Sequence, residues 1–457
     1  MRSGKKAGKA YEMDMCSGPL FSKLVVFAVP LILSGILQLL FNAADIIVVG
    51  KYAGHESLAA VGSTSALINL LVNVFIGLSV GANVLVAQYF GAHRMKDLEE
   101  TVHTAMVLAV GGGLLLVVLG VLLADPLLTL MGTPEDVLPL SALYMKIFFV
   151  GMPATLVYNF GSAILRAVGD TKRPLYFLML AGIINVVLNL FFVIYLHMGV
   201  AGVALATVIS QCISAALIVQ CLMRADAPYR LCLNQLKIVK EKLHAIAKIG
   251  LPAGLQGAIF SISNVLIQSS VNSFGSVAMA GNTAAANIEG FVYTAMNAVY
   301  QTALSFTSQN FGARNYERMT KILWYCQGLV IAVGIVMGGG SVLIGTQLLG
   351  IYSSDAQVIQ YGINRLRIIS GPYFLCGIME VMVGGLRGMG CSLLPMFVAL
   401  TGACVFRVVW IFTIFSVSRT LQTLYISYPV SWTITFMAHM ICYVVVRRRL
   451  ERQETKI

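Results

Sequence analysis

The polar and acidic side chains inside the apolar stretches are the residues of this sequence that could do chemistry. The stretch NAADIIVVG (42–50) follows an apolar run that begins near Phe21, so Asp45 falls where a membrane-spanning helix is normally apolar. Spacings of 4, 4 and 3 residues place four polar side chains on one helical face: Ser34, Gln38, Asn42 and Asp45. Because a polar stripe is costly against lipid, this face is predicted to line protein or a water-filled cavity. The alternative is that Asp45 caps the helix in interfacial water.

Asp45 is predicted to bind a proton or a sodium ion. Proton binding near neutral pH is favoured when a carboxylate is removed from water, whereas Na⁺ needs additional oxygen ligands. The fifth apolar stretch contains IINVVLNLFF, in which Asn185 and Asn189 are four residues apart and share a face with one another. Together with Asn42 they could serve the ion or hydrogen-bond Asp45; alternatively they only join helices. Pro30 lies about four turns before Asp45 and is a candidate hinge.

The second half of the chain offers further candidates for a substrate cavity. Glu289 and Tyr293 lie one turn apart, and an acid beside aromatic rings could hold a cationic amphiphile through charge and cation–π contact. A second face is predicted to line the same cavity: Gln256, Asn264 and Gln268. Glu380 is a further cavity candidate at membrane depth. The alternative for Glu380 is a buried structural ion pair with Arg407.

The composition is that of a polytopic membrane protein. The 457 residues are 58% hydrophobic and 11% charged, whereas a soluble domain carries about 25% charged residues. The nine cysteines form no CxxC pair and the six histidines form no HExxH motif, so no metal centre is expected. The sequence has no Walker A motif and no convergent catalytic set, so we expect neither an ATPase nor another enzyme, and no cofactor beyond a coupling ion.

Twelve apolar stretches are long enough to cross a membrane. They lie near residues 21–48, 57–89, 98–124, 138–162, 174–196, 200–223, 244–270, 279–308, 318–350, 358–386, 393–416 and 423–447. The predicted organisation is a basic cytoplasmic tail (1–20), an N-lobe of six helices (21–223), a cytoplasmic linker (224–243), a C-lobe of six helices (244–447) and a basic tail (448–457).

The two halves are internal repeats. Three pairs of segments match at offsets of 221 or 222 residues: VPLILSG (29–35) with LPAGLQG (251–257), QYFGA (88–92) with QNFGA (309–313), and LRAVGDTKRP (165–174) with LRGMGCSLLP (386–395). Because each half has six spans, the second half enters the membrane in the same orientation as the first. Parallel repeats of this kind are typical of transporters.

The basic residues predict the orientation in the membrane. With the N-terminus inside, 25 of the 31 lysines and arginines fall in cytoplasmic segments. This positive-inside distribution places both termini in the cytoplasm. It also explains the net charge of +12 by topology, so nucleic acid is not expected as a partner. Membrane lipid is expected around the helices, and no protein partner is indicated.

These features resemble the multidrug and toxic compound extrusion (MATE) family. The resemblance rests on Pro30 before Asp45, NAADIIVVG, the QYFGA/QNFGA pair, LRAVGDTKRP and GVAGVALATVIS, and it covers roughly residues 20–450. It is nearer to the DinF-like bacterial branch, since the seventh span has no acid. The resemblance implies two six-helix bundles around a central cleft. It also implies that the family's first-span aspartate and bending proline fall on Asp45 and Pro30.

The chain departs from this family's pattern in the fifth span. DinF-like members carry an asparagine followed four residues later by an aspartate, and here Asn185 matches while the aspartate position holds Asn189. One titratable partner is therefore missing. We predict a secondary antiporter in the bacterial plasma membrane that exchanges H⁺ or Na⁺ for organic cations or amphiphiles. The alternative is a flippase for a lipid-linked oligosaccharide or cell-wall precursor, whose cavity would be rich in arginine and lysine.

Overall fold

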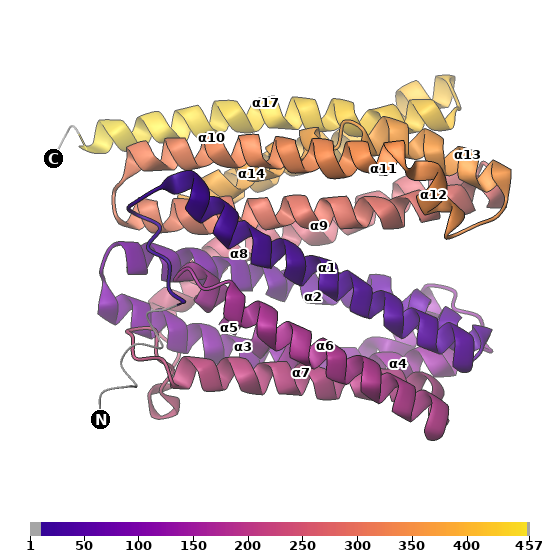
Figure 1. Ribbon diagram of the computed structural model, residues 1–457, viewed down its shortest axis with the longest axis horizontal. Coiled ribbons are helices and arrows are strands. Elements are labelled where there is room, and N and C mark those ends of the chain that lie inside the picture. The colour runs from indigo at the N-terminus through magenta and orange to yellow at the C-terminus, as the bar shows by residue number, and fades with distance from the viewer. Residues whose placement is uncertain (1–10, 455–457) are drawn as a thin grey trace. The chain divides into compact units, whose positions relative to one another are not determined.

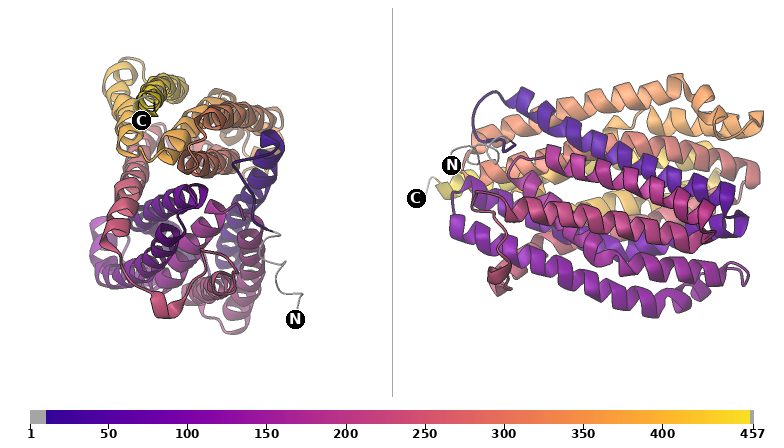
Figure 2. Two further views of the ribbon diagram at one scale, coloured as in Figure 1. Left: turned by 90° about the vertical axis from the view of Figure 1, so that its left-hand side faces the viewer. Right: turned by 60° about the horizontal axis from the view of Figure 1, so that its bottom comes forward.

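A computed structural model of the chain describes residues 11–454, and all regular elements in this range are helical (Figure 1). Contacts between helices divide the chain into two compact units. Unit 1 comprises Met1–Ser17 and Leu33–Ala258, and unit 2 comprises Gly18–Ile32 and Ile259–Ile457. Within each unit the long helices run alongside one another (Figure 2). Each unit is described below by itself.

Unit 1 contains the helices of the first repeat. They are the later part of α1 (Leu20–Tyr52), α2 (His55–Gly91), α3 (Met95–Leu130), α4 (Leu138–Val150), α5 (Met152–Ala167), α6 (Lys172–Leu190) with η2 (Phe191–Tyr195), and α7 (Gly199–Met223). The short η3 (Leu233–Gln235) and the first part of α8 (Lys240–Asn272) complete it.

Unit 2 contains the helices of the second repeat. They are α9 (Ser276–Gly312), α10 (Tyr316–Val333), η4 (Gly334–Gly339), α11 (Gly340–Leu343), α12 (Gly345–Gly350), α13 (Ala356–Arg365), η5 (Leu366–Ser370), α14 (Phe374–Gly388), α15 (Leu393–Ala399), η6 (Leu400–Val405), α16 (Phe406–Trp410), η7 (Ile411–Phe415) and α17 (Leu421–Glu454). The later part of α8 and the first part of α1 also belong to it.

The helices follow the twelve predicted apolar stretches. Within the described residues, nine helical segments are long and apolar enough to cross a membrane, and two bent pairs raise the number to eleven. The bent pairs are α4 with α5, at 48°, and α13 through η5 with α14, at 43°. Outward-facing apolar side chains fit lipid contact, as at Leu130 and Val417, which are 84% and 89% exposed.

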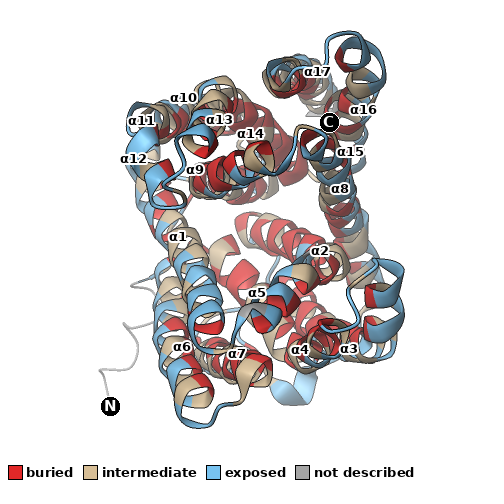
Figure 3. Ribbon diagram, turned by 90° about the vertical axis from the view of Figure 1, so that its right-hand side faces the viewer, coloured by how far each residue is buried: buried red, intermediate tan, exposed pale blue. Residues whose placement is uncertain are grey.

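The remaining stretch, α9, is the central helix of unit 2. It packs against α10, α13 and α14, and much of its surface is buried (Figure 3). A helix that contacts protein on most sides does not need an apolar surface for lipid, which explains its higher polar content. The equivalent helix of unit 1 is α2, which packs against α3, α4 and α5.

The backbone carries the same repeat as the sequence. Helices α2 and α9 both begin after a glycine in a left-handed conformation, which a side chain would strain. Positive φ angles recur at pairs of positions 221 residues apart: Gly54 (88°) and Gly275 (91°), His93 (53°) and Arg314 (54°), Gly169 (97°) and Gly390 (82°). The two units are therefore built from one structural repeat.

Helix α2 crosses the first part of α8 at glycines. Gly77 of α2 lies against the backbone of Gly250 and Gly254 in α8, and Gly81 lies against Gly250 and Ile246. A Cβ at Gly77 or Gly254 would overlap backbone atoms of the other helix. Glycine is therefore required at this crossing because the two backbones are in direct contact.

The units differ from the predicted lobes at two helices. The sequence predicts an N-lobe that begins at residue 21 and a C-lobe that begins at residue 244. In the structure, residues 20–32 of α1 pack with unit 2 and residues 240–258 of α8 pack with unit 1. The first parts of α1 and α8 are thus exchanged between units, and the predicted linker 224–243 lies within unit 1. Part of the predicted tail 448–457 continues α17 as far as Glu454, and residues 455–457 lie outside the described residues.

The segment before α1 is anchored to unit 1. The Tyr229 hydroxyl donates a hydrogen bond to the Glu12 carboxylate at 2.7 Å, and Met13 packs against Gly169. Burial and the Glu12 charge raise the pKa of Tyr229, so the hydroxyl stays protonated and continues to donate. The Arg173 guanidinium lies 5.3 Å from the centroid of the Tyr11 ring. Residues 11–13 are therefore held by identifiable contacts.

We expect Tyr229→Phe to loosen this segment without affecting the fold. The change removes one hydrogen bond to a charged group, which contributes about 1.5–3 kcal/mol. Limited chymotryptic cleavage after Tyr11 should become several-fold faster in the variant, while thermal stability of the detergent-solubilised protein changes little. Unchanged proteolysis would show that the Glu12 contact does not hold the segment.

Candidate functional site

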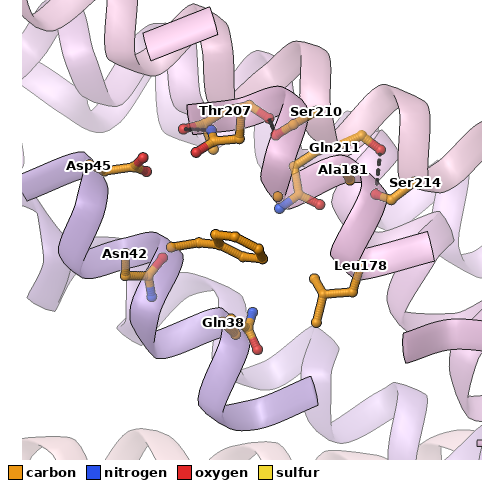
Figure 4. A pocket seen from close by; sticks show the side chains of 12 residues that line it. Gln38, Asn42, Asp45, Leu178, Ala181, Thr207, Ser210, Gln211 and Ser214 are labelled. Carbon is orange, nitrogen blue, oxygen red and sulfur yellow. Dashed lines mark hydrogen bonds between the residues drawn. The ribbon is translucent and has the colours of Figure 1, made fainter. Parts of the chain in front are cut away.

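Unit 1 contains a polar cavity of about 70 Å³ beside Asp45. Figure 4 shows Gln38, Asn42 and Asp45 on one helix, facing polar side chains of neighbouring helices. The complete lining is Gln38, Phe41, Asn42, Asp45, Leu178, Ala181, Gly182, Asn185, Thr207, Ser210, Gln211 and Ser214. Three helices, α1, α6 and α7, supply these residues. Ser34, which belongs to the same predicted face of α1, is not among them.

Close packing brings α1 and α6 together at this cavity. The Phe41 ring lies against Gly182, where a Cβ would overlap the ring. This contact lets the polar face of α1 approach the asparagines of α6. Asn185 and Asn189 are 5% and 0% exposed, so both side-chain amides are removed from bulk water. Buried amides of this kind need hydrogen-bond partners.

A chain of hydrogen bonds connects the three helices. Asn189 donates through Nδ2 to the Asp45 carboxylate, which links α6 to α1. The same nitrogen donates to Asn185 Oδ1 at 3.2 Å, and Asn185 Nδ2 donates to Thr207 Oγ1 of α7 at 3.4 Å. Asn189 Oδ1 is buried and has no hydrogen-bond partner among the described residues. The network therefore ends in one ionisable group, Asp45, and one unused acceptor.

The contribution of α7 to the cavity is not among the predictions from the sequence. Thr207, Ser210, Gln211 and Ser214 all line the cavity. Their spacing of three and four residues forms a polar stripe in GVAGVALATVISQCISAALI, which was available in the sequence. The stripe is weak because serine and threonine often bond to their own helix. Ser210 and Ser214 do so here, donating to Thr207 O and Gln211 O.

Unit 2 contains a separate cavity of about 310 Å³. Its lining includes Asn264, Gln268, Glu289 and Tyr293, which the sequence placed together. Gln256 does not line it, because that part of α8 belongs to unit 1. Glu380 is also not among the lining residues.

The acid in this cavity is paired with an arginine. Arg365 Nε and Nη2 donate to the two oxygens of Glu289 at 3.0 and 2.7 Å, and Arg365 Nη1 donates to Asn282 Oδ1 at 2.6 Å. The predicted alternative of a Glu380–Arg407 ion pair is not observed among the described residues, where the paired acid is Glu289. Arg365 falls in the predicted span 358–386, and spacing alone does not identify its partner.

Two further predictions concern the hinge and metals. Helix α1 is continuous through Pro30, and the boundary between the two units falls after Ile32. The hinge therefore remains a prediction. Among residues 11–454, no group of three or more His, Cys, Asp or Glu side chains is arranged to hold a metal ion.

Comparisons with known proteins agree with this architecture. The MatE family model matches the chain twice, at residues 30–191 and 252–413. The probable multidrug resistance protein YoeA of Bacillus subtilis is 29% identical over 385 residues, which cover 81% of each chain. It is thus a relative over most of its length.

Solved structures show the same fold. A MOP superfamily transporter from Pyrococcus furiosus superposes with a TM-score of 0.89 at 23% identity, covering 96% of this chain and 98% of that chain. A multidrug resistance MATE family transporter in its outward-facing conformation superposes with a TM-score of 0.89 at 22% identity, covering 98% and 99%. The fold of two six-span repeats predicted from the sequence is confirmed.

Proposed function

The chain belongs to the MatE family, and from this premise we propose that it is a multidrug efflux antiporter that exchanges H⁺ or Na⁺ for organic cations or amphiphiles. We place it in the bacterial plasma membrane with both termini in the cytoplasm. The orientation rests on the distribution of lysine and arginine in the sequence.

The observation that carries the proposal is the position of Asp45. It is the one acidic residue among the twelve that line the cavity of unit 1. An ionisable group that projects into a polar cavity within a membrane protein is typically part of an ion pathway. The volume of about 70 Å³ accommodates water molecules or an ion but not a polycyclic drug. We therefore assign the cavity to the coupling ion.

Asn189 suits both charge states of Asp45. Its amide N–H groups donate to the ionised carboxylate, as in the structure. If Asp45 takes up a proton, the carboxyl O–H can donate to the amide oxygen of Asn189, which accepts no hydrogen bond from the described residues. A 180° rotation of the amide group exchanges the two roles. An aspartate at this position would add a second titratable group, which Asn189 does not.

Helix α1 connects the ion site with both units. Residues 33–52, including Asp45, belong to unit 1, while residues 18–32 belong to unit 2. Ion binding neutralises Asp45 and changes its hydrogen bonds to α6. We propose that α1 responds by bending near Pro30, which lies beside the boundary between the units. Because α1 has residues in both units, this bending would change the packing of both, and it would drive release of the organic cation.

Binding of Na⁺ requires a different state of the same residues than binding of a proton. It requires an ionised Asp45 together with oxygen ligands, for which Asn42, Asn185 and Thr207 are available in the lining. Asn189 would then present its oxygen to the ion. The flippase alternative gains no support from this cavity, since none of its lining residues is a lysine or arginine.

Purified protein in liposomes tests the proposal. Ethidium movement is measured with a proton gradient alone, with a sodium gradient alone and with neither. We expect exchange to depend on one gradient, which identifies the coupling ion. If ethidium moves equally fast when neither gradient is present, antiport is contradicted.

We expect Asn189→Leu to reduce ion-driven exchange by about tenfold or more, because hydrogen bonds to charged groups contribute about 1.5–3 kcal/mol. Leucine has the branched shape of asparagine, although it is larger, and it removes both polar atoms. The matched control is Asn69→Leu, at an exposed position of α2. If both variants transport like the wild type, Asn189 does not assist Asp45.

A further inference from the structure

The cavity of unit 2 has a wall of aromatic rings. Tyr293, Tyr373, Tyr428 and Trp432 all line it, and Tyr293 is 40% exposed. The rings of Tyr373 and Trp432 are stacked at 5.2 Å, and those of Tyr428 and Trp432 meet edge to face at 5.8 Å. A volume of about 310 Å³ with aromatic walls is of the size that binds a small planar molecule.

The single carboxylate on this wall is already neutralised. Both oxygens of Glu289 accept hydrogen bonds from Arg365, and both side chains are buried. Asn282 strengthens this arrangement: its Oδ1 accepts from Arg365 Nη1 and from the Tyr425 hydroxyl at 3.0 Å, and its Nδ2 donates to Gln268 at 2.9 Å. A cationic ligand that competed for Glu289 would leave Arg365 buried without an acid, which is strongly unfavourable.

Guanidinium groups also occupy the aromatic faces. Arg407 lies 4.1 Å from the Tyr428 ring centroid and 5.7 Å from that of Trp432, and Arg365 lies 5.9 Å from that of Tyr428. A ring that already attracts a guanidinium offers less to a second cation, because the two positive charges repel one another. This wall is therefore poorly suited to a cationic amphiphile.

The buried charges of unit 2 do not balance. Arg365 is paired with Glu289, and Arg387 interacts electrostatically with Glu380. Arg407 is 3% exposed and forms no ion pair among the described residues. Its Nε donates to Ser431 at 2.9 Å, while its buried Nη2 has no hydrogen-bond partner in the part of the chain that the structure describes. The Arg407 guanidinium, which lies against the Tyr428 ring of the cavity wall, thus has no acidic partner among the described residues, and an anion would stabilise it.

We propose that the cavity of unit 2 is a second ligand site that selects planar aromatic molecules carrying an anionic group, such as a carboxylate or sulfonate. The exposed ring of Tyr293 supplies stacking area, and Arg407 with Arg365 supplies the positive field. All lining residues belong to unit 2, so this site is distinct from the Asp45 cavity. It broadens the ligands of the protein beyond the organic cations proposed above.

Two fluorescent probes with one ring system test the proposal. Anthracene carboxylate and aminomethyl anthracene differ in the sign of their charge at neutral pH. Their binding to the full-length protein in phosphatidylcholine nanodiscs is measured by fluorescence anisotropy, with empty nanodiscs as the baseline. We expect the carboxylate to bind at least about tenfold more tightly. Equal binding, or tighter binding of the amine, would overturn the proposal.

Variants then locate the preference. Arg407→Gln should reduce the preference for the carboxylate about tenfold, whereas Arg407→Lys keeps the charge and should largely retain it. Arg419→Gln removes the same charge at an exposed position and should change nothing. Glu289→Gln acts in the opposite direction, raising carboxylate affinity by leaving Arg365 unpaired. Equal losses in Arg407→Gln and Arg407→Lys would show that packing, not charge, is responsible.

If Arg407→Gln does not fold, as judged by size-exclusion chromatography, the comparison of the two probes on the wild type still decides the question. These measurements use no ion gradient. Their failure therefore leaves the antiport proposal intact, and loss of antiport leaves them interpretable.

Discussion

Replacing Asp45 by asparagine is expected to abolish ion-driven efflux. Asparagine has the size of aspartate and can still hydrogen-bond Asn189, but it cannot ionise. Because Asp45 is the one acid in its cavity, no neighbouring lining residue can replace its charge. Cells that express the variant should retain ethidium like cells without the transporter, a reduction of at least about tenfold in efflux rate.

The matched control is Asp136→Asn, which removes an exposed acid from the loop before α4. It should transport like the wild type. Expression and size-exclusion profiles of both variants establish that they are folded. Full efflux by Asp45→Asn would move the coupling ion to another acid, of which Glu380 in α14 is a candidate.

Replacing Gly77 by valine is expected to prevent stable folding of unit 1. The new Cβ would overlap the backbone of Gly250 and Gly254 in α8, and neither helix backbone can yield without separating the crossing. Overpacking between side chains costs about 1–3 kcal/mol, and a clash with backbone should exceed that range. We expect little monodisperse protein in detergent and a strongly lowered melting temperature.

Gly111→Val provides the control for this substitution. Gly111 of α3 is exposed, and a Cβ added there would meet no atom of another described residue beyond its own helix within 4 Å. The same increase in side-chain volume should therefore be tolerated at this position. Normal yield and stability for Gly77→Val would show that α2 and α8 do not cross as closely as the structure has them.

Much of the fold could be predicted because its signals are local. Hydropathy predicts all the spans. They include α9, which is too polar to be counted among the helices that are apolar enough to cross a membrane. The repeat was visible in QYFGA and QNFGA, and the structure repeats the backbone at His93 and Arg314 in the following turns. The exchange of the first parts of α1 and α8 between units was not predictable, because it depends on packing between helices that are distant in sequence.

The sequence predicts residues that share one helix better than contacts between helices. The spacing of Gln38, Asn42 and Asp45 defines one helical face, and the structure places these residues together on the cavity of unit 1. Spacing within one helix cannot identify partners on another. The pairing of Arg365 with Glu289 and the contribution of α7 to the Asp45 cavity therefore follow only from the structure.

The central claim is that Asp45 binds the ion which the organic cation displaces. The most direct test measures the affinity of the purified transporter for ethidium while the proton and sodium concentrations are varied separately. For the wild type, we predict that affinity falls as one of the two ions becomes more concentrated, and that this dependence disappears in Asp45→Asn. An ion dependence that persists in the variant, or a wild-type affinity that depends on neither ion, would contradict the account.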